Sequence, residues 1–107
     1  MTYQVLVLAE AEDDIIDIVG YITRADGPER ADHILNEIQT SCEKLSDLPG
    51  RGHIPPEIER LGVRDFREIH FKPYRIIYQV IGRKVYVHAV LDGRRSLQEL
   101  LERRLLR

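Results

Sequence analysis

The chain has 107 residues, of which 43% are hydrophobic and 32% are charged. A chain of this length can bury its own core, so we expect residues 1–107 to form a single domain. No apolar run approaches the roughly 20 residues that a membrane-spanning helix needs, and no export signal is visible before the first apolar segment. These features exclude a membrane protein and predict a cytoplasmic one.

Charge is divided unevenly along the chain. Residues 1–50 hold eleven Asp and Glu against three Lys and Arg, whereas residues 51–107 hold thirteen Lys and Arg against seven Asp and Glu. This division predicts a basic surface in the second half that attracts nucleic acid or an acidic protein. Alternatively, the two halves neutralise each other in the folded molecule.

The first half of the chain predicts a strand and two helices. Residues 3–8 are apolar and rich in β-formers, which favours a strand. From Ala9 the apolar residues recur every three or four positions, as in an amphipathic helix, and its acidic first turns, Asp14 included, are expected in solvent or paired with the helix dipole. The segment 26–28 ends this helix, because Gly27 breaks it and Pro28 suits the start of the next one. The second helix is expected to reach about Ser46 and to pack against the first as a hairpin.

The second half predicts three strands and a short helix. Residues 48–56 are rich in proline and glycine and indicate a loop. The expected strands are residues 63–71, 74–81 and 84–91, and a two-residue turn with glycine first joins the last two. Ser96 and Glu99 form a capping box for a helix through about Arg104. By simple alternation, Val85, Val87, Ala89 and Leu91 share one face of the last strand, and Tyr86, His88 and Val90 share the other.

The sequence predicts neither a disulfide nor a metal site. Cys42 is the only cysteine, and we expect it to pack in a helix interface. His33 and His53 stand on different predicted elements, and no pair of histidines has the spacing of a zinc motif.

The order of these elements gives an α+β fold, in which the N-terminal strand joins an antiparallel three-strand meander and a helical hairpin covers the sheet. Residues 74–80 (Tyr-Arg-Ile-Ile-Tyr-Gln-Val), the hairpin and valine-rich strand after them, and Gly-Arg-Arg at 93–95 resemble the signature of the RelE/ParE toxin superfamily. Leu48-Pro49 and Arg67-Glu68 stand in the usual order of that superfamily. The resemblance covers nearly the whole chain. It implies a growth-inhibiting toxin of a type II toxin–antitoxin (plasmid stabilisation) module that binds a cognate antitoxin as a hetero-oligomer.

The superfamily divides into two activities, and the resemblance points towards one of them. RelE-like members cut messenger RNA on the ribosome without a metal or cofactor, whereas ParE-like members inhibit DNA gyrase and need no catalytic set. Arg75 and Arg95 match the two arginines that RelE-like nucleases aim at the phosphate. However, Phe66 and Glu68 stand where the nucleases have lysines, and Leu101 stands where they have a tyrosine. The resemblance therefore favours a gyrase inhibitor rather than an enzyme, with the ribosome-dependent endoribonuclease as the alternative. A third possibility is a toxin that has decayed into a binding-only module.

Two sets of functional residues follow from this resemblance. If the chain is a nuclease, His70, His88 or Glu68 would transfer protons beside Arg75 and Arg95; alternatively, both histidines are ordinary strand residues. In either case we expect the target to contact one exposed patch of the sheet. The predicted target-binding residues are Arg67, Arg75, Tyr78, Arg94 and Arg95.

Overall fold

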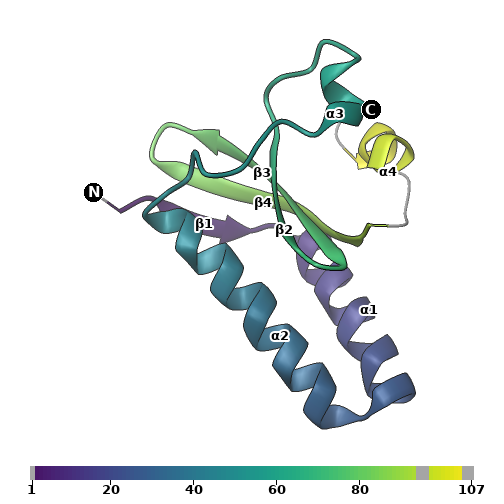
Figure 1. Ribbon diagram of the computed structural model, residues 1–107. Helices are drawn as coiled ribbons and strands as arrows, with labels where there is room; N and C mark the ends of the chain where they lie inside the picture. Colours follow the sequence, from purple (N-terminus) through teal and green to yellow (C-terminus); the bar gives the residue numbers. More distant parts are fainter. Residues whose placement is uncertain (1, 94–96, 105–107) are drawn as a thin grey trace.

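The computed structural model describes residues 2–93 and 97–104. A strand and two long helices come first, and three strands flanked by two short helices follow (Figure 1). In chain order the elements are β1 (Gln4–Val7), α1 (Ala9–Asp26), α2 (Pro28–Glu43), a 3-10 turn (Lys44–Ser46), α3 (Pro56–Glu59), β2 (Arg67–Phe71), β3 (Tyr74–Ile81), β4 (Lys84–Asp92) and α4 (Leu97–Arg104).

The four strands form one mixed sheet in the order β1-β4-β3-β2. β1 lies parallel to β4, and two hairpins make β2, β3 and β4 antiparallel neighbours. The α1–α2 hairpin covers one face, which we call the inner face, and α3 and α4 lie beside the opposite, outer face (Figure 1). The predicted α+β fold, with the N-terminal strand joined to an antiparallel meander, is confirmed.

The break between the two long helices falls at Gly27, as the sequence predicted. Gly27 has a φ of 97°, a conformation that side chains disfavour, and its N–H donates to the carbonyl oxygens of Ile22 and Thr23. Pro28 is the first residue of α2, where a backbone N–H would have no helical partner. The short connection holds the two helices antiparallel.

The predicted faces of β4 are wrong for its last residues, because a β-bulge lies at His88. In the register with β3, Tyr78 is opposite Val87 and Ile77 is opposite Ala89, so His88 is the extra residue. Val85 and Val87 therefore face the inner core, but after the bulge Val90 does so instead of Ala89. Ala89 and Leu91 pack on the outer face.

β2 is shorter than the predicted strand of residues 63–71. It begins at Arg67, whose partner is Tyr78, and Phe66 instead packs into the outer core at 8% exposure. The residues before Phe66 follow α3 through a turn at Gly62, which has a φ of 79°. The predicted loop of residues 48–56 ends one residue early, because the short helix α3, which was not predicted, begins at Pro56.

Two hydrophobic cores lie on the two faces of the sheet. The inner core joins α1 and α2 to the sheet, and the outer core joins Phe66, Ile77 and Leu91 to α3 and α4. Cys42 lies in the inner core, as predicted for a helix-packing residue, and burial raises the pKa of its thiol to about 11. The thiol is therefore protonated at neutral pH.

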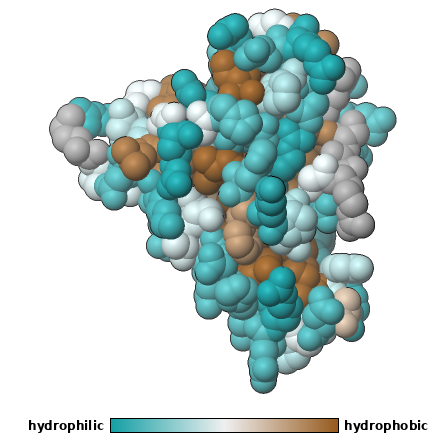
Figure 2. Space-filling model, viewed as in Figure 1, coloured by the Kyte–Doolittle hydropathy of each residue, from teal (hydrophilic) through white to brown (hydrophobic). Residues whose placement is uncertain are grey.

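The surface is mostly hydrophilic in the view of Figure 2, with apolar residues showing over the helical hairpin close to the sheet. Among the described residues, each helix is too short or too polar to span a bilayer.

The inner core generates a stability prediction. Ile38 on α2 is fully buried, so Ile38→Ala should lower the free energy of unfolding by about 2–5 kcal/mol through lost burial and the cavity that remains. Ile16 on α1 is 65% exposed, so Ile16→Ala is the matched control and should change that energy by about 0.5 kcal/mol or less. Urea titrations measure both, and equal midpoints for the two variants would contradict the placement of the core.

Candidate functional site

The outer face of the sheet gathers charged side chains from β2, β3 and α3. Glu68 is opposite Ile77 in the β2–β3 register and His70 is opposite Arg75, so all four project from the same face of the sheet. Glu57 approaches them from α3, the helix that sequence reasoning missed. This part of the face is the candidate site.

Arg75 occupies the centre of the site and is held by two carboxylates. Its two terminal nitrogens donate to Glu57 at 2.6 and 2.9 Å, in the bidentate geometry that arginine and carboxylate favour. Its Nε and one terminal nitrogen donate to Glu68 at 2.7 and 3.0 Å. We call Glu57, Glu68 and Arg75 the Arg75 cluster. Only 13% of the Arg75 side chain is exposed, so the predicted exposed guanidinium is wrong.

The three members of the Arg75 cluster stabilise one another's charges. Hydrogen bonds from Arg75 hold the pKa of the Glu57 carboxyl below its usual range. Burial would raise the pKa of Glu68, but hydrogen bonds from Arg75 and His70 outweigh burial and lower it. The hydrogen bonds to Glu57, against the opposing effect of burial, raise the pKa of Arg75. The cluster is therefore fully ionised at neutral pH.

Two histidines contact the Glu68 carboxylate from the side that faces solvent. Nε2 of His70 lies 2.8 Å from Oε1, and Nε2 of His53 lies 3.3 Å from Oε2. His53 belongs to the loop before α3, and its backbone forms an isolated antiparallel bridge with Glu68. His53 and Glu68 are far apart in sequence, which is why spacing alone did not associate them.

These side chains line a shallow surface pocket of about 540 Å³ that also includes Arg60, Lys72 and Gly93. His70 and Arg75, both predicted as site residues, therefore lie together in it. His88 makes other contacts: its Nε2 is 3.1 Å from Oε1 of Gln79, and its ring meets Phe66 edge to face. Burial lowers the pKa of His88, which keeps the imidazole neutral at neutral pH.

Arg67 and Tyr78 lie on the inner face, opposite to Arg75. Tyr78 is fully buried; its hydroxyl donates to the Pro49 carbonyl at 2.7 Å and accepts from the Gly52 N–H at 3.0 Å. Arg67 donates to the Gly52 carbonyl at 2.9 Å. A Cβ at position 52 would lie 2.5 Å from both the Glu68 carbonyl oxygen and the Tyr78 hydroxyl, so only glycine fits. The prediction that Tyr78 contacts a target is wrong, because it anchors this loop instead.

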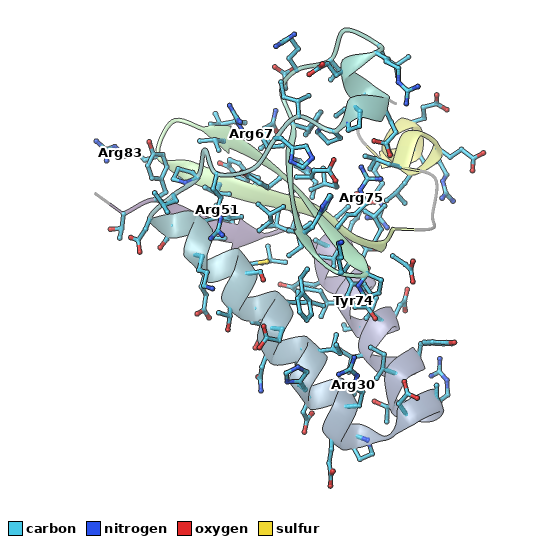
Figure 3. All side chains as sticks on the ribbon, viewed as in Figure 1. Arg30, Arg51, Arg67, Tyr74, Arg75 and Arg83 are labelled. Atoms are coloured by element: carbon cyan, nitrogen blue, oxygen red, sulfur yellow. The ribbon has the colours of Figure 1, made fainter. Side chains whose placement is uncertain are left out.

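The predicted single patch is therefore not present among the described residues. Arg75 is internally paired, and Arg67 points to the other face from it. Figure 3 shows Arg83 at the β3–β4 turn and Arg30 on the helical hairpin, both well away from Arg75. Arg94 and Arg95, predicted to bind the phosphate or the target, lie outside the described residues.

A second ion pair joins the first helix, α1, to the last helix, α4. Asp14 on α1 is 5% exposed and accepts two hydrogen bonds of 2.7 Å from Arg104 on α4. It also accepts the backbone N–H of Val90 at 3.0 Å. The Asp14 hydrogen bonds raise the pKa of Arg104. The expectation that Asp14 is solvated or paired with the helix dipole is wrong, because it secures α4 against α1 and β4.

The fold is shared with chains of two solved toxin–antitoxin structures. A chain of a structure described as the chromosomal ParDE TA system from P. aeruginosa superposes with a TM-score of 0.72, at 17% identity, over 85% of this chain and 96% of that one. A chain of the toxin–antitoxin complex RelBE2 from Mycobacterium tuberculosis superposes with a TM-score of 0.62, at 20% identity, over 86% and 92%. At these identities the likeness shows a shared fold.

The family follows from the sequence match. Residues 5–97 match the model of the family described as the ParE toxin of the type II toxin-antitoxin system, parDE. The chain therefore belongs to the ParE toxin family, within the RelE/ParE superfamily that its motifs indicated. Comparison with curated proteins gave no match.

The Arg75 cluster predicts a structural role for its arginine. Arg75→Met would leave two carboxylates without their cation, one of them almost fully buried, and should lower the free energy of unfolding by about 3 kcal/mol. Arg64, which is exposed, gives the matched control: Arg64→Met should change it by about 0.5 kcal/mol or less. Urea denaturation measures both, and an undiminished stability of Arg75→Met would show that the guanidinium is free.

The lowered pKa of Glu57 predicts how stability depends on pH. A carboxyl whose folded pKa is below its unfolded pKa stabilises the fold above the unfolded value, about 4.3 for Glu, and this contribution is lost as the pH falls through the folded value. Acidification from about pH 6 to about pH 3, which starts above the unfolded value of about 4.3, should therefore destabilise the wild type more steeply than Glu57→Gln. The control is Glu59→Gln, an exposed position on the same helix, which should keep the wild-type slope. Parallel slopes for all three proteins would contradict the pairing.

Proposed function

We propose that this ParE-family toxin inhibits DNA gyrase by binding it, without cleaving RNA, and that a cognate antitoxin neutralises it. The observation that supports a non-catalytic mode is the state of Arg75. An arginine offers five N–H donors, and the Arg75 cluster uses four hydrogen bonds from Arg75 to Glu57 and Glu68. Little of the guanidinium remains for a phosphate.

Electrostatics at the site also argue against phosphate chemistry. A phosphodiester that is being cleaved develops negative charge, which a nuclease stabilises with cations. Here two carboxylates share one guanidinium, and Glu68 lies beside the position where the phosphate would be held. Bringing a phosphate to Arg75 would require the release of at least one of these two ion pairs.

The alternative function is the ribosome-dependent endoribonuclease. His70 and Arg75 line the same pocket, which is the observation in its favour, and a substrate that displaced Glu57 could reach both side chains. His70 would then be the proton-transfer residue, since His88 contacts Gln79 and Phe66 instead.

An antitoxin partner is supported by the molecule's surface as well as by its family. The structures that share this fold are described as a toxin–antitoxin system and a toxin–antitoxin complex. On α1, Ile16 and Tyr21 are 65% and 64% exposed, and such apolar residues would be covered by a protein partner. We propose that the antitoxin binds over this hairpin and forms a hetero-oligomer with the toxin.

A supercoiling assay tests the proposed target. The purified chain should inhibit DNA supercoiling by gyrase in proportion to its concentration, and messenger RNA in a purified translation system should stay intact. Full supercoiling at saturating toxin would reject gyrase as the target. Cleaved transcripts that depend on ribosomes and are lost in His70→Gln would establish the alternative.

The predicted target-binding arginines have their own test. We propose that Arg94 and Arg95 contact the target, so Arg94→Ala combined with Arg95→Ala should weaken inhibition by about tenfold or more, a loss of about 1.4 kcal/mol in binding. Arg64→Ala is the control for removing an exposed positive charge elsewhere, and its inhibition should match the wild type. Equal inhibition by the double variant and the control would exclude the two arginines as contacts.

A further inference from the structure

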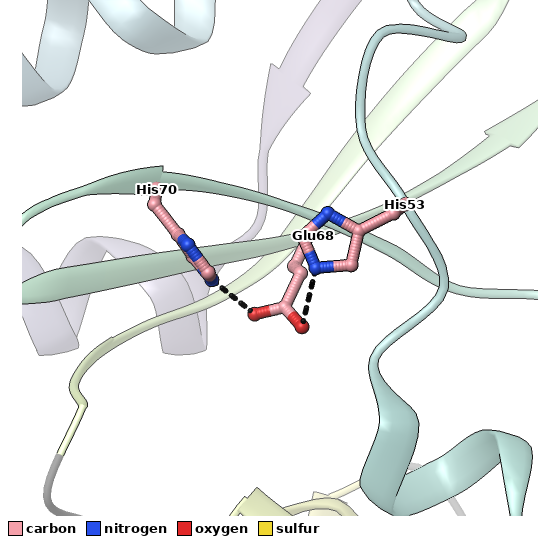
Figure 4. Close-up of side chains that lie close together, drawn as sticks. All are labelled: His53, Glu68 and His70. Carbon is pink, nitrogen blue, oxygen red and sulfur yellow. Dashed lines mark hydrogen bonds and ion pairs between the residues drawn. The ribbon is translucent and has the colours of Figure 1, made fainter.

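Three metal-ligating side chains meet beside the Arg75 cluster, and the proposed function makes no use of their grouping. Nε2 of His53 and Nε2 of His70 both face the carboxylate of Glu68 (Figure 4). The ligand atoms of the three residues lie within 4.8 Å of one another. In a tetrahedral zinc site with bonds of about 2.0–2.1 Å, ligand atoms are about 3.3–3.5 Å apart, so small side-chain movements would suffice.

The backbone holds these side chains in place without help from a ligand. His53 and Glu68 exchange both backbone hydrogen bonds of an antiparallel bridge, at 3.1 and 2.7 Å. His70 lies two residues beyond Glu68 on β2, so it projects from the same face of the strand. The two imidazole rings meet edge to face with their centroids 5.4 Å apart. The three side chains therefore converge because His53 pairs with Glu68 through the backbone and His70 follows Glu68 on the same face of β2.

The charge of the surroundings favours a cation. Glu57 and Glu68 contribute two negative charges and Arg75 one positive charge, so the cluster has one excess negative charge when both imidazoles are neutral. Arg60 and Lys72 also line the pocket, but both are exposed and solvent screens their charges. Arg75 donates two hydrogen bonds to Glu68 and two to Glu57, and its pairing with Glu57 offsets its repulsion of an ion at Glu68.

We propose that His53, Glu68 and His70 form a binding site for a divalent transition-metal ion of the zinc class. Two imidazole nitrogens and one carboxylate oxygen suit Zn²⁺, whereas Mg²⁺ and Ca²⁺ require mostly oxygen ligands. The imidazoles bind through Nε2 as the tautomer that has its hydrogen on Nδ1. A water molecule from the pocket completes the coordination.

The site is open to solvent and connects two segments of the chain. The side chains of His53 and His70 are 60% and 44% exposed, so an ion reaches them directly, while Glu68 is the buried ligand. A bound ion would tie the loop before α3 to β2 at a second point, in addition to the backbone bridge. An ion that binds the folded chain alone also raises its stability.

Titration of the tag-free chain with ZnCl₂ by isothermal calorimetry tests the site. We expect one ion per chain for the wild type, and an affinity at least about tenfold lower for His53→Gln and for His70→Gln. His33→Gln is the matched control, since His33 is an exposed histidine on α2, and its affinity should equal that of the wild type. MgCl₂ should give no binding heat.

Two results of the calorimetric titration would overturn the site. One is no saturable Zn²⁺ binding by the wild type, and the other is binding that both His53→Gln and His70→Gln retain unchanged. A second measurement needs no variant: in the NMR spectrum of the wild type, Zn²⁺ should shift the ring signals of His53 and His70 and leave those of His33 and His88 in place. Shifts confined to His33 or His88 would also overturn it. Neither measurement involves gyrase, so failure of the proposed function leaves the result intact.

Discussion

The outer half of this molecule is organised around one guanidinium that two carboxylates share. Arg75 on β3 connects Glu57 on α3 to Glu68 on β2, and the second core, with α3 and α4, forms next to this connection. Removing charged groups from water costs free energy, and the network offsets that cost only while all three members are present. Because Arg75 is needed in this network, its guanidinium is not exposed for target contact as the superfamily motif implies. A structural network and a phosphate-binding site therefore compete for one residue, and in this chain the network holds it.

The network also sets the chemistry of the region around it. By the superfamily resemblance, Glu68 stands where the nucleases have a lysine, and the buried carboxylate at this position needs a cation, which Arg75 provides. With Glu68 in place, histidines from β2 and from the preceding loop approach the carboxylate. The carboxylate at position 68 thus gives this face an arrangement that can attract cations.

Local patterns predicted most of the fold, and long-range contacts account for what they missed. Gly27 and Pro28 placed the helical break, and Gly82 placed the last hairpin, because these residues act through their own backbone preferences. The contacts of Asp14 with Arg104 and of Glu57 with Arg75 join elements far apart in sequence, so no periodicity reveals them. At the site, the superfamily resemblance predicted Arg75 and His70. Their partners could not be predicted, because they depend on strand register and on the short helix α3 at the end of a proline-rich segment.

The bulge at His88 reverses the alternation of inward and outward side chains along the rest of β4. All residues after it appear on the opposite side of the sheet from the one that the start of the strand would assign, so Val90 contacts the helical hairpin and Leu91 contacts α4. Deleting His88, the extra residue, would restore the regular alternation and leave Val90 inward and Leu91 outward, whereas pairing every residue of the strand without a bulge would exchange the two sets. A chain that shares the fold but lacks the bulge therefore needs either one residue fewer in its last strand or the inverse order of inward and outward apolar residues at the end of that strand.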